Sequence, residues 1–123
     1  MSNTTFSIMD TTDNHINYVE FKGTDLKKLK KFYQEAFGWV FTDYGPTYIA
    51  FAESGIQGGF ELTKKPIVNS ALVVLYHNNL DTSKYKVLTA GGTLTKDIFS
   101  FPGGKRFQFK DPSGNELAVW SDN

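Results

Sequence analysis

The chain has 123 residues and a mass of 13.8 kDa, which is the size of one domain and leaves no room for a second full domain. Hydrophobic residues make up 40% of the chain, aromatic residues 15% and charged residues 21%, which supports a folded core and excludes a disordered chain. Thirteen Lys and Arg balance thirteen Asp and Glu, so no net charge draws the chain to nucleic acid or to an anionic membrane.

The chain contains no cysteine, which excludes disulfides and zinc sites with Cys ligands. Its first residues, MSNTTFSIMDTTDN, lack a basic start and a long apolar run, and no segment is apolar over a length that could span a membrane. We therefore expect a soluble, cytoplasmic protein in which residues 1–14 form a loose polar tail.

The first half of the chain follows the pattern strand, helix, strand, strand, strand. Residues 16–22 (INYVEFK) alternate as a half-buried strand, and residues 25–37 place apolar side chains at helical spacing up to the stop at Gly38. Three short strands follow in WVFTDY, TYIAFAE and QGGFELT, separated by turns that contain glycine. This half is predicted to form one βαβββ module.

The second half repeats this order. A strand in ALVVLY precedes a helix in NLDTSKYKVLTAGG, and three strands follow in TLTKDIFSF, KRFQFK and ELAVWS. A shift of 54 residues aligns Leu26 with Leu80 and Gly38 with Gly92. The inner face of the second helix is expected to carry Leu80, Lys84, Val87 and Leu88. We predict one domain over residues 15–123, with module one at 15–63, a linker at 64–70 and module two at 71–121.

Three parts of the sequence resemble a known superfamily. The segment NYVEFKGTDLKKLKKFYQEAFGW, the glycine pair before Thr93 and the ending FQFKDPSGNELAVW are similar to the vicinal oxygen chelate superfamily, which contains glyoxalase I, extradiol dioxygenases and the bleomycin and fosfomycin resistance proteins. The resemblance covers residues 15–121. It implies an α+β fold of the glyoxalase/bleomycin resistance/dioxygenase type, in which two βαβββ modules form a cup of curved mixed sheet with the helices outside. It also implies a homodimer, but no single chemistry.

The metalloenzymes of this superfamily use four ligands, two from each module. The resemblance places these positions at Tyr18, Glu61, Leu72 and Ala118, and only Glu61 is a residue that the family uses. Leu and Ala have no donor atoms, and a phenol with a pKa of about 10 is a poor ligand at neutral pH. We therefore expect no cofactor, and we expect these four positions to disfavour a divalent metal.

Strand alternation predicts which side chains face the cup. The predicted lining consists of Tyr18, Glu20, Glu61, Leu72, Val74, Tyr76, Arg106, Gln108, Glu116, Ala118 and Trp120. Aromatic walls with a few polar groups are typical of a site for an organic molecule. The residues expected to bind this ligand are Tyr18, Glu61, Tyr76, Arg106, Gln108 and Trp120. The alternative is that these aromatic residues close a filled core or a subunit interface.

Glu20 and Glu61 are the candidates for catalysis, because two carboxylates on one face can separate their pKa values and act as acid and base. Arg106 shares the predicted face and would hold a carboxylate ionised, which argues against that role. His15 and His77 have the parity of the helix side, so no catalysis by histidine is expected.

The sequence therefore predicts a small-molecule binding protein of the glyoxalase and bleomycin-resistance type with a degenerate metal site. Such a protein would sequester or carry its ligand. The alternative is a lyase- or isomerase-type enzyme that uses the same cup, either through a non-standard metal site or through acid–base chemistry by Glu20 and Glu61. No nucleic acid and no membrane are expected as partners.

Overall fold

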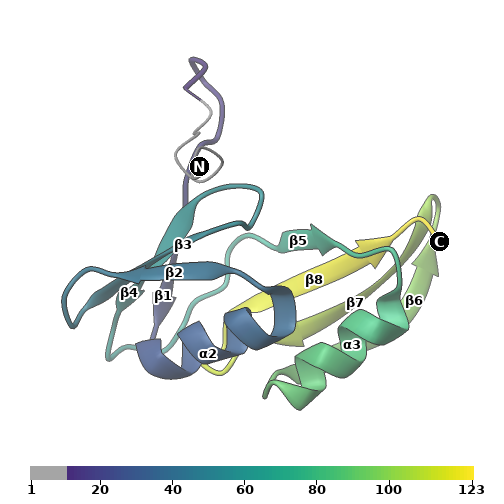
Figure 1. Ribbon diagram of the computed structural model, residues 1–123. Coiled ribbons are helices and arrows are strands. Elements are labelled where there is room, and N and C mark those ends of the chain that lie inside the picture. The colour runs from purple at the N-terminus through teal and green to yellow at the C-terminus, as the bar shows by residue number, and fades with distance from the viewer. Residues whose placement is uncertain (1–10) are drawn as a thin grey trace.

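The structure, a computed structural model, describes residues 11–123, so most of the predicted tail lies outside the described residues. Figure 1 shows two successive units along the chain. In the described residues each unit has one helix and four strands. The first unit contains β1 (Val19–Gly23), α2 (Leu26–Phe37), β2 (Val40–Asp43), β3 (Tyr48–Ala52) and β4 (Gly58–Leu62). The second contains β5 (Val73–Tyr76), α3 (Leu80–Thr89), β6 (Thr93–Phe101), β7 (Gly104–Lys110) and β8 (Glu116–Ser121).

Each unit forms a four-stranded mixed sheet, and both sheets have the same strand order. The first sheet has the order β1-β4-β3-β2 and the second the order β5-β8-β7-β6. In each sheet the first strand is parallel to the last strand of its unit, and the other neighbours are antiparallel. This topology confirms the α+β class and the two predicted βαβββ modules.

The helices begin and end at capping residues. The Asp25 side chain accepts a hydrogen bond of 3.1 Å from the Lys28 backbone N–H at the start of α2. Asn79 accepts from the Thr82 N–H at the same distance at the start of α3. Gly38 ends α2 with a φ of 74°, a left-handed conformation that glycine adopts without strain. Neither helix within residues 11–123 is long and apolar enough to cross a membrane.

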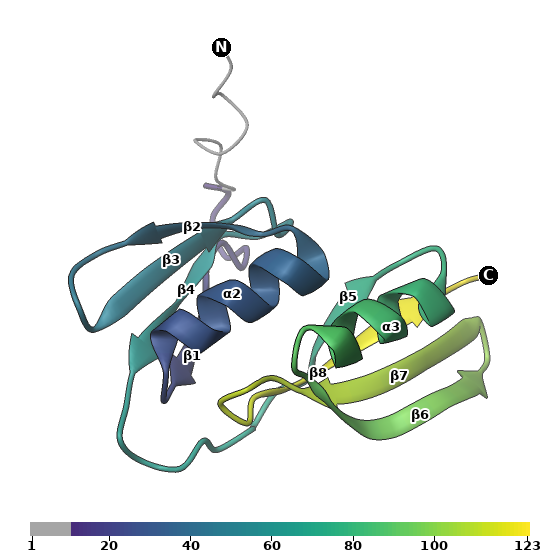
Figure 2. The ribbon, with the colours of Figure 1, turned by 60° about the horizontal axis from the view of Figure 1, so that its bottom comes forward.

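An aromatic core fills the space between the helices and the sheets. Figure 2 shows that α2 covers one face of the first sheet and α3 covers one face of the second, with the two helices close together. The ring of Phe32, which is almost fully buried, lies 6.0 Å from the ring of Phe109 in the second sheet. The Tyr33 ring stacks on Trp39 with 4.6 Å between centroids. The core is therefore shared by both modules.

The inner face of α3 differs from the prediction. Ser83 and Val87 are buried beside Leu80, whereas Leu88 is 43% exposed. Lys84 points instead to the sheet edge, where its Nζ lies 2.8 Å from Asp97 Oδ1. Leu80 and Val87 are thus buried as predicted, whereas Ser83 takes the place predicted for Lys84, because a small serine packs closely and a lysine remains at the surface.

The turn between β7 and β8, residues 111–115, joins the two modules. Asn115 Nδ2 donates a hydrogen bond of 2.8 Å to the Lys22 carbonyl, and the Thr24 N–H donates one of 3.0 Å to Ser113 Oγ. The buried Tyr33 hydroxyl donates to Asp111 Oδ2 over 2.9 Å. The DPSGN motif therefore fixes the end of β1 and the start of α2 against the second module.

Candidate functional site

The residues predicted to line the cup lie on the sheet faces that α2 and α3 leave uncovered. In the first sheet, Lys22 pairs in register with Glu61, which pairs with Tyr48 on the other side. In the second sheet, Arg106 pairs in register with Trp120. Residues opposite one another in a ladder share a face, so each sheet presents one group of polar and aromatic side chains away from its helix.

A hydrogen-bonded cluster occupies this face of the first sheet. The hydroxyls of Tyr18 and Tyr48 are 2.5 Å apart, and Tyr48 donates a hydrogen bond of 3.0 Å to Glu20 Oε1. Lys22 Nζ lies 3.9 Å from Glu20 Oε2 and forms a close ion pair with Glu61. The two candidate carboxylates therefore share one lysine, and a chain of polar contacts runs from Tyr18 to Glu61.

The electrostatics of this cluster do not favour the acid–base hypothesis. The pKa of Lys22 is raised above its ordinary value, mainly by its hydrogen bond with Glu61, against desolvation and with help from the charges of Glu61 and Glu20. Lys22 therefore stays protonated between the two carboxylates. The pKa of Tyr48 is also raised, first by desolvation and then by hydrogen bonds with Tyr18 and Glu20, so this phenol stays a neutral donor.

Lys22 is the residue that sequence reasoning missed. Arg106 was the expected charge partner of these carboxylates, and this expectation is wrong, because Arg106 contacts neither of them. Lys22 has the same parity as Tyr18 and Glu20 on one strand, so the alternation itself contained the signal. Lys22 is the last residue of the predicted strand at 16–22 and lies on the same face as Tyr18 and Glu20, so the alternation places it in the cluster.

These residues do not fit a divalent metal. Glu61, the one position that matches a family ligand, is engaged by Lys22, and the Tyr18 hydroxyl is engaged by Tyr48. Leu72 has no donor atom, and Ala118 is fully buried between Val74 and Gln108. Within the described chain, no three His, Asp or Glu side chains converge as a ligand set.

A second cluster lies on the uncovered face of the second sheet. The rings of Tyr76 and Trp120 meet edge to face with centroids 5.3 Å apart. The guanidinium of Arg106 lies over the Phe99 ring, 5.2 Å from its centroid, and 6.0 Å from the centroid of Phe101. The Nε atom of Arg106 is buried without a hydrogen-bond partner. Arg106 forms no ion pair within residues 11–123, so its charge contacts only aromatic rings.

Two of the predicted ligand-binding residues already have protein partners. Gln108 Nε2 donates a hydrogen bond of 3.2 Å to Glu116 Oε2, which also accepts from Thr95 Oγ1 over 2.7 Å. The Tyr76 hydroxyl donates to Asp122 Oδ1 over 2.7 Å, and this contact is the main cause of a raised Tyr76 pKa. Arg106 is thus a charged group of this cluster with unused hydrogen-bonding capacity.

The six predicted ligand-binding residues fall into two groups. Tyr18, directly before β1, and Glu61 on β4 lie at the first sheet, whereas Tyr76, Arg106, Gln108 and Trp120 belong to the second. In the described part of the chain, no hydrogen bond, ion pair or ring contact joins the two groups. The contacts between modules run through the helices and the β7–β8 turn instead.

A hollow on the outer strands of the first sheet was not predicted. Its volume is about 660 Å³, and Val40, Thr42, Ala50 and Ala52 form its floor on the uncovered face. Val40 is 54% exposed and the neighbouring Tyr44 is 63% exposed. Small alanines between larger side chains leave this depression. Strand alternation shows which way a side chain points and not how far it extends from the sheet, so it does not predict the hollow.

Two βαβββ modules with one bare sheet face each define a class of small cup-forming proteins. The chain belongs to the Glyoxalase/Bleomycin resistance protein/Dioxygenase superfamily, whose sequence profile matches residues 15–119. This confirms the resemblance seen in the sequence. A protein of Mycobacterium tuberculosis named "Putative glyoxylase CFP32" is 27% identical over 87% of this chain, and the chain spans 45% of that relative's length.

Solved structures share the fold at low sequence identity. A glyoxalase/bleomycin resistance protein/dioxygenase family enzyme from Burkholderia phytofirmans superposes with a TM-score of 0.76 at 17% identity, covering 87% of this chain and 98% of that one. The antibiotic binding protein TnmS3 from Streptomyces superposes with a TM-score of 0.67 at 19% identity, covering 88% and 95%. At these identities the likeness describes the fold and leaves the ligand to be argued from the side chains.

Proposed function

We propose that this protein binds a small organic molecule on the uncovered face of its second sheet, and that it does so without a metal. Arg106 would hold an acceptor group of the ligand, and Trp120 and Tyr76 would contact its apolar body. Binding would serve to sequester or carry the molecule.

The observation that carries the proposal is the state of Arg106. A guanidinium has five N–H donors, and here Nε is buried without a partner while the group rests on Phe99 and Phe101. The N–H donors on its two Nη atoms also have no partner within residues 11–123, and they are not among the buried atoms. A ligand carbonyl or carboxylate in the plane of the guanidinium would pair with these donors. Arginine suits such an acceptor because its donors form a rigid fork.

The aromatic neighbours supply the apolar part of the site. Tyr76 is 52% exposed, and the Trp120 ring lies against it on the same face as Arg106. Rings in this arrangement give a ligand large contact area at low entropic cost. The similarity in fold to TnmS3, an antibiotic binding protein, agrees with this role.

A homodimer remains part of this proposal. The uncovered faces expose apolar side chains on both sheets, including Tyr18, Val40, Leu72, Val74 and Tyr76. Exposed apolar area of this extent is typical of surfaces that pair with another molecule. Two copies would bring the group around Glu61 opposite the group around Arg106, and sedimentation at micromolar concentration would show whether the protein dimerises.

The experiment compares two matched variants, Arg106→Met and Lys105→Met. Lys105 is an exposed neighbour on the same strand that points to the other face. A panel of aromatic compounds with carbonyl or carboxylate groups is screened by melting temperature and by the indole N–H resonance of Trp120. We expect a compound that raises the melting temperature and moves this resonance, and we expect Arg106→Met to weaken it about tenfold while Lys105→Met does not. A screen without any such compound, or equal effects of the two variants, would contradict the proposal.

A further inference from the structure

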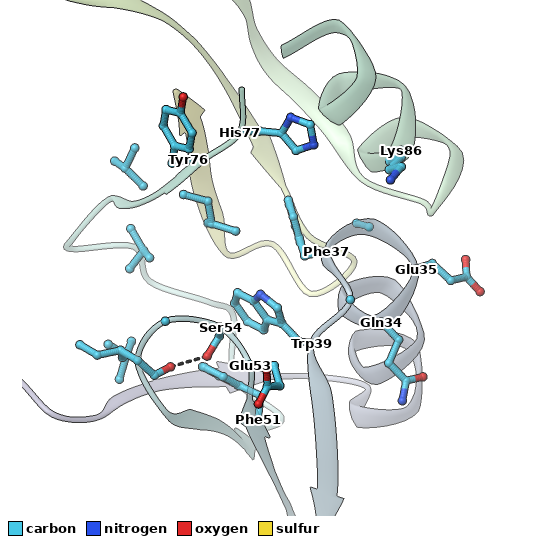
Figure 3. A pocket seen from close by; sticks show the side chains of 18 of the residues that line it. Gln34, Glu35, Phe37, Trp39, Phe51, Glu53, Ser54, Tyr76, His77 and Lys86 are labelled. Carbon is cyan, nitrogen blue, oxygen red and sulfur yellow. Dashed lines mark hydrogen bonds between the residues drawn. The ribbon is translucent and has the colours of Figure 1, made fainter. Parts of the chain in front are cut away.

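A row of side chains crosses the uncovered face of the second sheet, one from each strand. In register from β5 to β6 its members are Tyr76, Trp120, Arg106 and Phe99. In Figure 3 the Tyr76 hydroxyl points away from Trp39, which lines the pocket between the two modules. The row therefore belongs to the uncovered face over its whole length, and it ends at Phe99 on the edge strand.

Two bulges in β6 bring a lysine next to this row. Relative to β7, β6 has one extra residue between Leu94 and Lys96 and another between Lys96 and Phe99. Simple alternation would place Leu94 and Lys96 on one face and Phe99 on the other. With the bulges, Leu94 packs against the core, whereas Lys96 pairs with Gln108 and shares the uncovered face with Phe99. Bulges that re-aim a side chain are common beside functional sites.

Two cations lie over the ring of Phe99. Lys96 Nζ is 4.6 Å from the centroid of this ring, and the guanidinium carbon of Arg106 is 5.2 Å from the same centroid. Because both charges contact one ring, they are at most about 10 Å apart. Their potentials add at a point between them, so the edge of the Phe99 ring is a favourable place for an anion.

Protein carboxylates do not neutralise this pair of charges. Neither Lys96 nor Arg106 forms an ion pair in the part of the chain that the structure describes. Asp97, which follows Lys96 in the chain, lies 2.8 Å from Lys84 Nζ. Glu116, on the same face, accepts hydrogen bonds from two neutral side chains. Both cations are therefore available to a ligand.

We infer that the ligand of the site at Arg106 carries a doubly charged anionic group, and that Lys96 is the second cation that binds it. This inference rests on the function proposed above and names the ligand class more closely. The anion would lie between Lys96 and Arg106, and the aromatic body of the ligand would lie on Trp120 and Tyr76. A singly charged group would neutralise only half of this pair.

An aromatic phosphate monoester has the required chemistry. Its second pKa is about 6, so it is a dianion at neutral pH, and its three terminal oxygens can accept from both side chains at once. The guanidinium offers a fork of donors to two oxygens, and the lysine ammonium acts as a point charge on the third. The row from Phe99 to Tyr76 thus matches a ligand with its charge at one end and its rings at the other.

The test compares two esters of the same shape. 1-Naphthyl phosphate and 1-naphthyl sulfate each present a tetrahedral group with three terminal oxygens, and at about pH 8 they differ by one charge. Both are titrated at low salt, with the indole N–H resonance of Trp120 and the melting temperature as readouts. We expect the parent protein to bind the phosphate at least about fivefold more tightly than the sulfate.

Variants at the surface assign this preference to Lys96. Lys96→Met should reduce it to less than about twofold, whereas Lys96→Arg, which keeps the charge, should retain it. Lys105→Met is the control, because Lys105 points to the other face of the sheet. Lys96 and Lys105 are both exposed, so these variants should fold. Arg106→Met should weaken both esters.

The outcomes separate this inference from the function on which it rests. Equal affinity of the two esters in the parent, or a preference that survives in Lys96→Met, would overturn the role of Lys96. Lys96 would then serve only to protect the edge strand from pairing with other chains. The proposed site would stand if Arg106→Met still weakened both esters. Failure of both esters to bind up to about 1 mM would overturn the dianionic ligand, and the carbonyl and carboxylate compounds would then decide the proposed function separately.

Discussion

Tyr33 and Asp111, which are 78 positions apart in the chain, meet in the core through a hydrogen bond of 2.9 Å from the phenol to Oδ2. Tyr33 is fully buried on α2, and Asp111 is 4% exposed at the start of the β7–β8 turn. The other oxygen of Asp111 accepts from the backbone N–H groups of Ser113, Gly114 and Asn115. One carboxylate thus shapes the turn and binds it to the helix of the other module.

Removal of the phenol oxygen in Tyr33→Phe should lower the free energy of unfolding by about 1.5–3 kcal/mol, since the lost hydrogen bond has a charged acceptor. Urea denaturation measures the change. Tyr85→Phe is the control, because Tyr85 is 70% exposed and should stay within about 0.5 kcal/mol of the parent. Equal stabilities of the two variants would show that the bond between Tyr33 and Asp111 contributes nothing.

The pH dependence of stability should report the burial of Asp111. Desolvation raises the pKa of this carboxyl above its usual 3.8, although hydrogen bonds from Asn115 and Tyr33 act in the opposite direction. The folded chain therefore binds this proton more tightly than the unfolded chain. Its contribution to stability is greatest at low pH and is lost as the pH rises through the raised pKa.

The measurement is the difference in unfolding free energy between the parent and Asp111→Asn. This difference should decrease as the pH is raised from about 3.5 to 7 and become constant above the raised pKa, because other titrating groups cancel. A difference that increases over this range would show that hydrogen bonding outweighs burial at Asp111.

Phe32→Ala should destabilise the protein by about 3–5 kcal/mol, and Leu29→Ala by about 2–5 kcal/mol. Both side chains are essentially unexposed, and Phe32 contacts the rings of Tyr33 and Phe109. Lys28→Ala should have almost no effect, because the cap at the start of α2 uses the backbone of Lys28 and not its side chain. Chemical denaturation that placed Phe32→Ala within about 0.5 kcal/mol of the parent would contradict the packing of α2.

The repeated pattern of the sequence was sufficient to predict the fold. Helical spacing located α2, and alternation placed Phe21 in the core and Glu20 on the uncovered face. Such patterns show which side of a helix or strand each residue occupies, and this information was enough to predict two modules with the same order of elements. The proposed boundaries of tail, modules and linker stay predictions.

The arrangement of the site was less accessible from the sequence. Facing does not give the distance between strands, so alternation could not tell that Lys22, and not Arg106, would reach Glu61. Nor could it show that the predicted ligand residues separate into two groups. Nor does a local sequence pattern show how the two modules pack, and their packing leaves a pocket of about 850 Å³ that is lined by Trp39 and by residues of both modules.

Trp120→Ala should weaken ligand binding at the proposed site more than it weakens folding. Trp120 lies near the end of β8 on the uncovered face, where its ring contacts Tyr76 rather than the helix-side core. Truncation of an aromatic contact at the centre of a site commonly costs 10-fold or more in affinity, about 1.4 kcal/mol or above. In the proposed homodimer, where Glu61 of one copy would face Arg106 of the other, Glu61→Gln is expected to change ligand choice with little cost in stability, since its carboxylate is half exposed.

Titration of a ligand found in the screen, together with urea denaturation, checks this for both variants. A loss of stability for Trp120→Ala that equals or exceeds its loss of binding free energy would assign Trp120 to the fold. An unchanged affinity would remove it from the site.

The purified protein should hold no divalent metal tightly, for reasons that lie in the side chains at the family positions. Leu72 and Ala118 offer no lone pair, and Tyr18 would have to lose a proton and its contact with Tyr48 before it could act as a ligand. Glu61 already has a cation beside it, because Lys22 supplies an ammonium where a metal would have to bind. A metal would need to displace that lysine in exchange for a single carboxylate, and one carboxylate does not hold Zn²⁺, Ni²⁺ or Mn²⁺ against water.

Elemental analysis after exposure to Zn²⁺, Ni²⁺ and Mn²⁺ should therefore find far less than one metal per chain. Lys22→Met gives a more stringent test of metal binding, since it frees Glu20 and Glu61 from their shared ammonium without adding a ligand. We expect weak binding in this variant and none in the parent, because two exposed carboxylates still lack the further donors that a site requires. About one metal per parent chain, lost in Glu61→Gln, would show instead that the metal displaces Lys22 and that the site at Glu61 is functional.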